Sequence, residues 1–426
     1  MKVVVIGYGP GGAAAALAAR MFDSKAEVKI VTEENREAHR KPGASLALEF
    51  PDTDHLGIAD WSLKALSKKR IDVLLDTRVT KVDVSSRKVL LDTPKKRDDL
   101  DYDKLILATG GVPSVPDIPG TDLAGVHTIQ DMGDTSEIGK KLKGKERVVV
   151  VGAGFSGLET AERLLRMGKD THMVVRSRFM RRQMEEPMSS ELRSRIPKGI
   201  AIHDGFSPEC VEGEEHVTAI KVGDEVIATD AVLFMTGVKP NTKLAEAIGL
   251  RIGDLGGIVV DKTMKTSLDD IYAVGDCVEM IDPVSGKPIL LPIGSVAARA
   301  GRQAGVAAVG GKKVYEDTTL RLQYDRLFDT DIVCVGHSST TAKNVGIKTS
   351  VQYLEDPTEF TKAALVLDGK GILLGGQVIS SRMGARLAYE ILERVQSRAK
   401  LKDQPLLKPR HERLKEQLEN TLGPIR

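Results

Sequence analysis

Two glycine clusters are the part of this sequence whose residue types and spacing most clearly suggest chemistry. The cluster Gly7–Gly12 follows the β-branched run Lys2–Ile6, and the cluster Gly152–Gly157 follows Arg147–Val151. Glycine clusters also make ordinary turns, but a strand, a GxGxxG loop and a helix in this order present backbone N–H groups to a pyrophosphate. Because the pattern occurs twice, we expect two dinucleotide sites. The residues expected to line them are Gly7, Gly9, Pro10, Gly11, Gly12, Gly152, Gly154, Phe155, Ser156 and Gly157.

The residue that ends the next strand indicates which nucleotide each loop accepts. In the first copy Val28–Thr32 ends at Glu33, whose carboxylate can accept from both hydroxyls of an adenosine ribose, as in FAD or NAD. In the second copy His172–Val175 ends at Arg176, and Arg178 follows. A guanidinium pairs with a 2′-phosphate, so this site favours NADPH over NADH, unless these arginines belong to a solvated basic loop.

Composition excludes several other classes of protein. The length of 426 residues suggests two to three domains. The charges of the 62 basic and 60 acidic side chains nearly cancel, so the chain lacks the strong positive charge that would attract a nucleic acid. Cys210, Cys277 and Cys334 have neither disulfide-framework nor metal-ligand spacing, which predicts no metal and a reducing, cytoplasmic location. The N-terminus has no signal-peptide pattern, and no apolar run reaches the roughly 18 residues of a membrane span.

The elements that must position these loops can be read along the chain. The first copy closes with the apolar run Lys104–Gly110 and the second with Ala231–Gly237. A short helix is expected within Asn241–Leu250, and a buried strand at Ile271–Asp276. A longer helix is expected at Ser295–Val309, with Ser295 as its N-cap.

From about Tyr315 the pattern changes to alternating apolar runs, which predict an antiparallel sheet. These runs are Ile332–Val335, Lys348–Tyr353, Ala363–Leu367 and Ile372–Ile379. A covering helix is expected at Met383–Gln396, so this region is predicted to be a third, α+β, domain. The charged tail Lys408–Leu422 is expected to form a surface or partner-facing helix.

Taken in order, these motifs resemble the pyridine nucleotide-disulfide oxidoreductases, which are flavoprotein reductases with two dinucleotide domains. The resemblance covers essentially the whole chain. The motifs that carry it are Gly7–Gly12, Ala108–Gly110, Gly152–Gly157, Thr236–Asn241 and Tyr272–Cys277. Other segments resemble the branch that contains coenzyme A-disulfide reductase, NADH oxidase and NADH peroxidase. These segments are Leu291–Ser295, Ala297–Gly301, Val335–Ser338 and Ala342–Gly346.

The resemblance implies an α/β protein with two Rossmann-like domains and a C-terminal α+β dimerisation domain. FAD would be bound by residues 1–112 and 243–314, and NADPH or NADH by residues 113–242. Residues 315–426 would form the interface of a homodimer.

The resemblance also assigns roles to individual residues. Asp276 would bond the ribityl or pyrophosphate portion of FAD, and the helix from Ser295 would point its positive end at the flavin. Glu159 would lie near the flavin ring, although it could simply favour the first turn of its helix. His337 could donate a proton or be a core histidine. The further residues expected at the cofactors are Ala108, Thr109, Gly110, Gly237, Gly275, Gly294, Ser295 and Ala297.

The sequence departs from this branch at its redox cysteine. Depending on register, the cysteine position falls on Gly43, Ala44 or Ser45, and none of these is a thiol. A hydroxyl such as that of Ser45, the candidate catalytic residue here, cannot form a disulfide or a sulfenic acid. The neighbouring residues His39, Arg40 and Lys41 could attract an anionic acceptor or form a solvated loop.

The sequence therefore predicts an FAD-dependent NAD(P)H oxidoreductase that passes electrons directly to oxygen, a quinone or a small redox protein. One alternative is a coenzyme A-disulfide or polysulfide reductase, or an NADH peroxidase, whose cysteine has been replaced by mutation. Another is an FAD-binding, nucleotide-responsive subunit with negligible turnover.

Overall fold

The structure is a computed structural model that describes residues 1–40, 43–51, 57–94, 96–130, 132–315 and 319–400. Lys41 and the tail helix expected at 408–422 lie outside these described residues. The chain forms two compact units. The first comprises Met1–Arg176 and Gly199–Leu320, and the second comprises Ser177–Lys198 and the chain from Arg321 onward.

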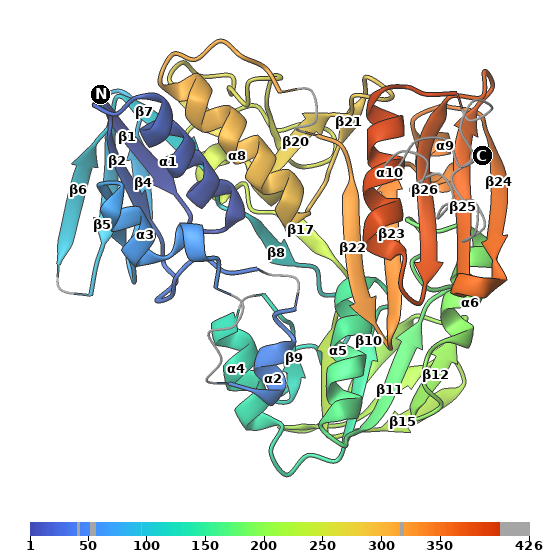
Figure 1. Ribbon diagram of the computed structural model, residues 1–426. Helices are drawn as coiled ribbons and strands as arrows, with labels where there is room; N and C mark the ends of the chain where they lie inside the picture. The colour runs from blue at the N-terminus through green and yellow to red at the C-terminus, as the bar shows by residue number, and fades with distance from the viewer. Residues whose placement is uncertain (41–42, 52–56, 95, 131, 316–318, 401–426) are drawn as a thin grey trace. The chain divides into compact units, whose positions relative to one another are not determined.

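A five-stranded parallel sheet forms the core of the N-terminal part of the first unit (Figure 1). Its order is β19-β7-β1-β2-β3, and every neighbouring pair is parallel. Its strands are β1 (Lys2–Ile6), β2 (Glu27–Val31), β3 (Ile71–Leu74), β7 (Lys104–Leu107) and β19 (Ile271–Ala273). β1 and β7 are almost wholly apolar because a parallel sheet is covered on both faces.

Helices α1 (Pro10–Phe22) and α8 (Gly294–Ala308) lie side by side against this sheet (Figure 1). Their contact requires small residues. A Cβ on Gly301 would lie 2.1 Å from the Gly11 carbonyl oxygen, so no larger residue fits there. The predicted N-cap Ser295 is wrong, because α8 begins one residue earlier, directly after the extended backbone of Ile293, which makes Ser295 the second helical residue.

Smaller elements complete this half of the unit. The antiparallel strands β4 (Arg78–Asp83), β5 (Lys88–Asp92) and β6 (Arg97–Asp101) pack on the same core through Val82, Val89 and Leu91. The remaining elements are α2 (Leu46–Glu49), η1 (Ala59–Trp61), α3 (Leu63–Lys68), α7 (Lys243–Ala247), β18 (Ile258–Val259), η2 (Gly275–Cys277), β20 (Val278–Ile281) and β21 (Pro288–Ile289).

A second five-stranded parallel sheet repeats the first, in the order β12-β11-β10-β16-β9. Its strands are β9 (Val126–His127), β10 (Arg147–Val151), β11 (Asp170–Val175), β12 (Ile200–Asp204) and β16 (Ala231–Phe234). Helix α5 (Phe155–Arg166) packs on β10 and β11, and α4 (Met132–Lys141) lies between β9 and β10 in the chain. An antiparallel sheet shares an apolar core with the parallel strands and consists of β13 (Pro208–Gly213), β14 (Val217–Val222) and β15 (Glu225–Ala228).

The chain crosses between the two parallel sheets twice, and the two crossings pair with each other. β8 (Gly111–Pro113) leaves the first sheet and β17 (Val238–Pro240) returns to it. The two strands are antiparallel, with Gly111 opposite Pro240. The crossings therefore hold the ends of β7 and β16 together.

The second unit is built on an antiparallel sheet of order β22-β23-β26-β25-β24. Its strands are β22 (Leu322–Leu327), β23 (Thr330–Gly336), β24 (Thr349–Asp356), β25 (Thr361–Asp368) and β26 (Leu373–Ser380). The unit also contains α6 (Glu186–Ser194), α9 (Ser339–Asn344), η3 (Pro357–Glu359) and α10 (Gly384–Gln396).

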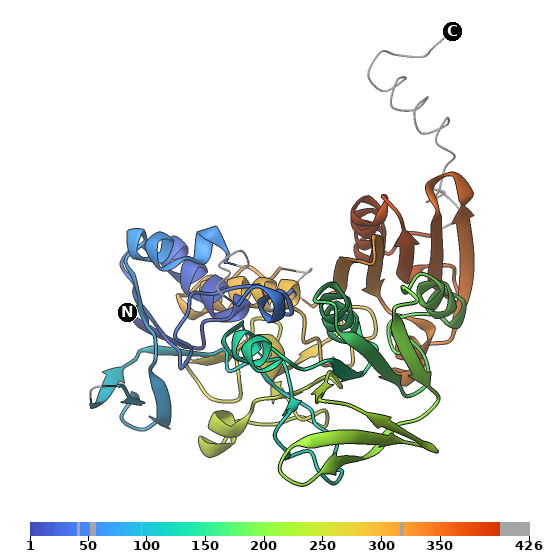
Figure 2. The same cartoon turned by 90° about the horizontal axis from the view of Figure 1, so that it is seen from below.

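Two helices cover opposite faces of this antiparallel sheet (Figure 2). A Cβ on Gly376 would meet Ile391 of α10, whereas its neighbour Gln377 accepts a hydrogen bond at 2.7 Å from the N–H of Glu185, just before α6. Successive strand residues point to opposite faces. The predicted fold class, α/β with two Rossmann-like sheets and a C-terminal α+β part, is confirmed. Among the described residues, no helix combines the length and the apolar character that crossing a membrane requires.

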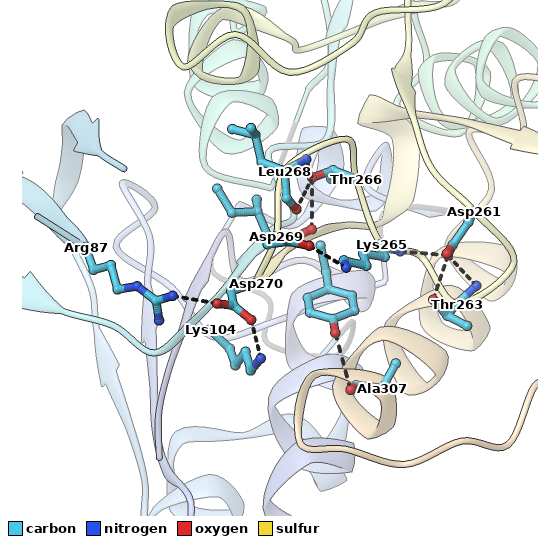
Figure 3. A network of polar contacts seen from close by, with 12 residues as sticks. Arg87, Lys104, Asp261, Thr263, Lys265, Thr266, Leu268, Asp269, Asp270 and Ala307 are labelled. Carbon is cyan, nitrogen blue, oxygen red and sulfur yellow. Dashed lines mark hydrogen bonds and ion pairs between the residues drawn. The ribbon is translucent and has the colours of Figure 1, made fainter. Parts of the chain in front are cut away.

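An ion-pair network fixes the start of β19, where the chain re-enters the first sheet (Figure 3). Asp270 pairs with Lys104 and, at 2.7 Å, with Arg87. Lys104, followed by Arg87, holds the pKa of Asp270 below its usual value. Asp270 has a positive φ of 64°, a conformation that Asp and Asn tolerate better than most residues.

We predict that Asp270→Asn lowers the free energy of unfolding at pH 7 by about 1 kcal/mol, because it removes a charge and keeps the backbone conformation. The folded pKa is depressed, so this stabilisation is present above the unfolded value near 3.8 and is lost as the pH falls through the folded value. Urea unfolding of the wild type and of Asp270→Asn at pH 7, 4 and 3 measures the difference in their free energies of unfolding. Asp269→Asn, at a side chain that is 90% exposed, serves as the control and should cost little. A difference that stays constant down to pH 3 would contradict the assignment.

Candidate functional site

The first glycine loop closes around backbone contacts that admit no side chain. Gly7 has φ +107°, and a Cβ there would lie 2.2 Å from the carbonyl oxygen of Ala108. A Cβ on Gly12 would lie 2.0 Å from the carbonyl oxygen of Gly7. Gly9, in contrast, would meet nothing within 4 Å. The loop is therefore tight on its protein side and open at Gly9, which fits the close approach of a pyrophosphate.

Two helix N-termini meet beside this loop. α1 begins at Pro10 and α8 at Gly294, and neither has a side-chain cap. A Cβ on Gly294 would lie 3.8 Å from Pro10 Cγ, so the two helix starts are neighbours. Uncapped N–H groups and the positive ends of two helix dipoles favour an anion here.

The predicted residues of η2 are brought to the same place. Gly275 has φ +83°, and its Cβ would lie 3.6 Å from the Cβ of Ala297 in α8. Asp276, which is half-buried, follows directly in η2. The structure thus gathers the first glycine loop, the Gly-Asp turn and the start of α8.

The segment after β2 presents further polar groups. Gly7 N–H donates to the Val31 carbonyl at 2.8 Å, so the end of β2 and the exposed Glu33 lie next to the loop. Arg36 Nε and His39 Nε2 are buried and have no hydrogen-bond partner within the described part of the chain. Because buried polar atoms are normally satisfied, these orphaned nitrogens suit a bound ligand. The residues present therefore fit a dinucleotide such as FAD.

The second glycine loop repeats the construction of the first. Gly152 has φ +119°, and its Cβ would lie 2.4 Å from the Met235 carbonyl oxygen. A Cβ on Gly157 would lie 2.1 Å from the Gly152 carbonyl oxygen, while Gly154 is open. Helix α5 begins directly afterwards, at Phe155, without a side-chain cap, and Ser156 is exposed in its first turn. The loop fits a second dinucleotide.

Hydrogen bonds join the strand ends at the two crossings. Thr109 Oγ1 donates to the Asn241 carbonyl at 2.7 Å, and Asn241 N–H donates to the Gly110 carbonyl at 2.9 Å. Ser114 N–H donates to the Gly237 carbonyl at 2.8 Å. The predicted segments Ala108–Gly110 and Thr236–Asn241 are therefore neighbours.

The two predicted phosphate-binding arginines differ in their surroundings. Arg176 is exposed and directly follows β11. Arg178 lies in the second unit, where its guanidinium donates to the carbonyls of Met184 at 2.5 Å and Arg181 at 2.9 Å. Arg178 therefore holds the conformation of its own loop, whereas the guanidinium of Arg176 faces solvent.

Glu159 contacts the segment that lacks the cysteine. It is 8% exposed, and its Oε2 accepts a hydrogen bond from Gly43 N–H at 3.0 Å. One turn later on α5, Arg163 pairs with Glu49 of α2. Sequence analysis missed both contacts, although the i,i+4 spacing of Glu159 and Arg163 places them on one face of the helix.

Helix α4 holds the same segment from another direction. A Cβ on Gly139 would lie 2.3 Å from the Leu48 carbonyl oxygen, and Ser136 Oγ donates to the Pro51 carbonyl at 2.9 Å. Ser45, the candidate catalytic hydroxyl, is 5% exposed at the start of α2. The segment is therefore clamped by α4 and α5, with Gly43 against Glu159.

Two of the three cysteines are buried, whereas Cys210 is partly exposed. Cys277 is fully buried in η2, with Sγ 3.2 Å from the Val274 carbonyl oxygen, and burial raises its pKa. Burial also raises the pKa of Cys334 in β23 to about 12. Both stay protonated at neutral pH, and the protonated thiol is not the nucleophile. His337 is likewise buried in the second unit, with Nδ1 3.1 Å from Thr341 Oγ1.

Known proteins share this architecture over most of their length. The "NADH oxidase" of Methanocaldococcus jannaschii is 31% identical over 408 residues, which cover 92% of this chain and 89% of the relative. The "NAD(P)H coenzyme A polysulfide/persulfide reductase" of Pyrococcus horikoshii is 27% identical, with 91% and 89% covered. The structure of an NAD-dependent persulfide reductase from A. fulgidus superposes with a TM-score of 0.88 at 28% identity, covering 96% of this chain and 79% of that one.

A family model described as pyridine nucleotide-disulphide oxidoreductase matches residues 1–304. Membership of this family implies FAD and a nicotinamide nucleotide, and the two glycine loops fit them. Its relatives are NAD(P)H-dependent oxidoreductases. The chain therefore belongs to the pyridine nucleotide-disulphide oxidoreductase family and is an NAD(P)H-dependent flavin oxidoreductase.

Proposed function

We propose that this enzyme oxidises NAD(P)H, with NADPH slightly preferred, and passes the electrons from FAD directly to an acceptor, with no thiol in between. The observation that carries the proposal is the segment Gly43–Ser45. It offers no sulfur, and it is packed against Glu159 at the position where the family's branch has its redox cysteine. The name of the M. jannaschii relative, NADH oxidase, supports oxygen as the acceptor proposed here.

Different residues of the chain would bind the two cofactors and position the acceptor segment. The loop Gly7–Gly12, with Glu33 and Asp276, would hold FAD, and the loop Gly152–Gly157, with Arg176, would hold the nicotinamide nucleotide. FAD, when bound, supplies hydride acceptance and electron transfer to the acceptor. The N-terminus of α8 would stabilise the negative charge that reduction creates. Glu159 would position the Gly43 segment beside the acceptor.

The predicted domain boundaries belong to the same proposal. Residues 1–112 and 243–314 would form the FAD domain, residues 113–242 the nucleotide domain and residues 315–426 the dimerisation domain. We further infer a homodimer and a cytoplasmic location. Because the P. horikoshii relative is named a polysulfide/persulfide reductase, sulfur compounds are a second class of acceptor to be tested.

An acceptor panel tests the function. FAD-loaded enzyme is reduced by NADPH without oxygen, and reoxidation of the flavin is followed after adding oxygen, a quinone, a small iron–sulfur protein, coenzyme A disulfide or polysulfide. We expect oxygen, the quinone or the redox protein to reoxidise it, and the sulfur compounds to fail, because thiol exchange needs a thiolate. Rapid reoxidation by a sulfur compound alone would contradict the proposal. Failure of NADPH and NADH to reduce the flavin within minutes would favour a non-catalytic subunit.

Nucleotide preference is tested at Arg176. Arg176→Gln should lower kcat/KM for NADPH about tenfold or more and leave that for NADH nearly unchanged, because a charged hydrogen bond to the 2′-phosphate contributes about 1.5–3 kcal/mol. Arg251→Gln, at an exposed arginine in the segment 243–314, is the matched control. Equal losses with both nucleotides would show that Arg176 does not read the 2′-phosphate.

The role of Glu159 is tested with two substitutions. Glu159→Gln keeps an oxygen that can accept from Gly43 N–H, whereas Glu159→Ala removes it and leaves that partly buried donor without its partner. If Glu159 positions the segment, Gln should retain the acceptor half-reaction within about threefold, and Ala should lose about tenfold. Glu162→Gln, one turn away, is the control. A Gln variant as slow as Ala, with an altered pH profile, would instead assign proton transfer to the carboxyl.

A further inference from the structure

Two histidines in the second parallel sheet meet edge to edge. His172 of β11 and His203 of β12 have Nδ1 and Nε2, respectively, 2.9 Å apart. Their ring centroids are 5.1 Å apart and their planes differ by only 12°. A nitrogen contact this short at that centroid separation requires the two nitrogens to lie on the line between the rings. The imidazoles therefore share a hydrogen bond within nearly one plane.

The outer nitrogen of each ring is bonded to a carboxylate. His172 Nε2 lies 3.2 Å from Asp170 Oδ1, and His203 Nδ1 lies 2.6 Å from Glu225 Oε2. An ionised carboxylate only accepts hydrogen bonds, so both outer nitrogens must carry a hydrogen. If both rings were neutral, both inner nitrogens would then present lone pairs to each other at 2.9 Å. A third proton between the inner nitrogens removes that repulsion.

The charges around the pair balance with this proton count. Three hydrogens on four nitrogens give the pair one positive charge. Asp170 and Glu225 contribute two negative charges, and Arg147 of β10, whose Nε lies 2.5 Å from Asp170, contributes one positive charge. Asp204 and Asp224, the chain neighbours of His203 and Glu225, are also acidic but are not part of this balance. Arg147 holds the pKa of Asp170 below its usual value, which keeps that carboxylate ionised.

The surroundings also resist a second added proton. The His172 side chain is 13% exposed, and burial lowers its pKa, with His203 and Arg147 acting in the same direction and Asp170 opposing. The pair is thus expected to take up one added proton and not two. Because the folded pKa of His172 is depressed, the unfolded chain binds more protons below about pH 6.5, and stability falls as the pH drops through that range.

We propose that His172 and His203 form a one-proton site, in which a proton shared by the two imidazoles ties β11 and β12 to β15. The tie joins the parallel sheet to the antiparallel sheet that shares its core, within the nucleotide-binding half of the first unit. The hydrogen bond between the two rings forms when the pair carries one added proton, and it weakens when the pair carries none or two. The proposal does not depend on the identity of the electron acceptor.

Histidine NMR of the full-length, FAD-loaded enzyme counts these protons directly. The protein is labelled with ¹⁵N-histidine, and the two rings are assigned with His172→Gln and His203→Gln. We expect three of the four ring nitrogens to be protonated in the folded enzyme at pH 7.5, namely the two outer nitrogens and one of the two inner nitrogens. Two neutral rings at this pH would overturn the proposal.

A stability measurement covers the case in which the histidine variants fail to fold. Glu225→Gln removes the charge that compensates the shared proton, so its thermal midpoint should begin to fall at a lower pH than that of the wild type as the pH rises. Glu209→Gln is the matched control, since Glu209 is also exposed on this antiparallel sheet and pairs with Lys221 at 2.8 Å. Parallel pH profiles for wild type, Glu225→Gln and Glu209→Gln between pH 6 and 9 would also overturn the proposal.

Discussion

The structure depends on backbone contacts at the two glycine loops that are too close for any side chain. In each loop the first glycine lies against a carbonyl at the end of a neighbouring strand, Ala108 in one case and Met235 in the other. The last glycine of each loop lies against the carbonyl of the first. These contacts fix the turn from strand to helix and aim the N-terminus of α1 or α5 at the open side. The same constraint, met twice, produces two loops that fit a pyrophosphate from two stretches of sequence.

The segment Gly43–Ser45, which contains no cysteine, is held in place by contacts with two helices. α2 and the turn before it have no extended secondary structure of their own, yet α5 contacts them through Glu159 and Arg163, and α4 contacts them through Gly139. Such a clamp fixes the backbone regardless of which side chain stands at Gly43. The backbone of this segment can therefore keep its geometry without a cysteine, which is the condition that the proposed direct transfer from the flavin requires.

The second unit takes part of its structure from the middle of the chain. Ser177–Lys198 leaves the parallel sheet after β11 and joins the C-terminal sheet. Glu185 anchors this segment, because its carboxylate accepts from Ser339 N–H at 2.8 Å and its own N–H donates to Gln377. The segment that follows β11 is thus anchored on the C-terminal sheet through Glu185.

By itself the sequence determined the strand, loop and helix around each glycine cluster and most strands of the C-terminal sheet, because a β-branched run, a glycine cluster and an apolar helix stripe are each encoded within a few residues. It did not predict the small antiparallel sheets β4-β5-β6 and β13-β14-β15, nor β22. It predicted the two parallel sheets, the antiparallel sheet and both phosphate loops from those local patterns. The start of α8 was predicted one residue late, since Ser295 is a good cap by type but Ile293 has the extended backbone. Only the tertiary structure decided that Glu159 meets Gly43, that Arg178 bonds its own loop and that His172 meets His203. Each of these depends on which residues, distant in sequence, packing brings within hydrogen-bond reach, and no local periodicity records that.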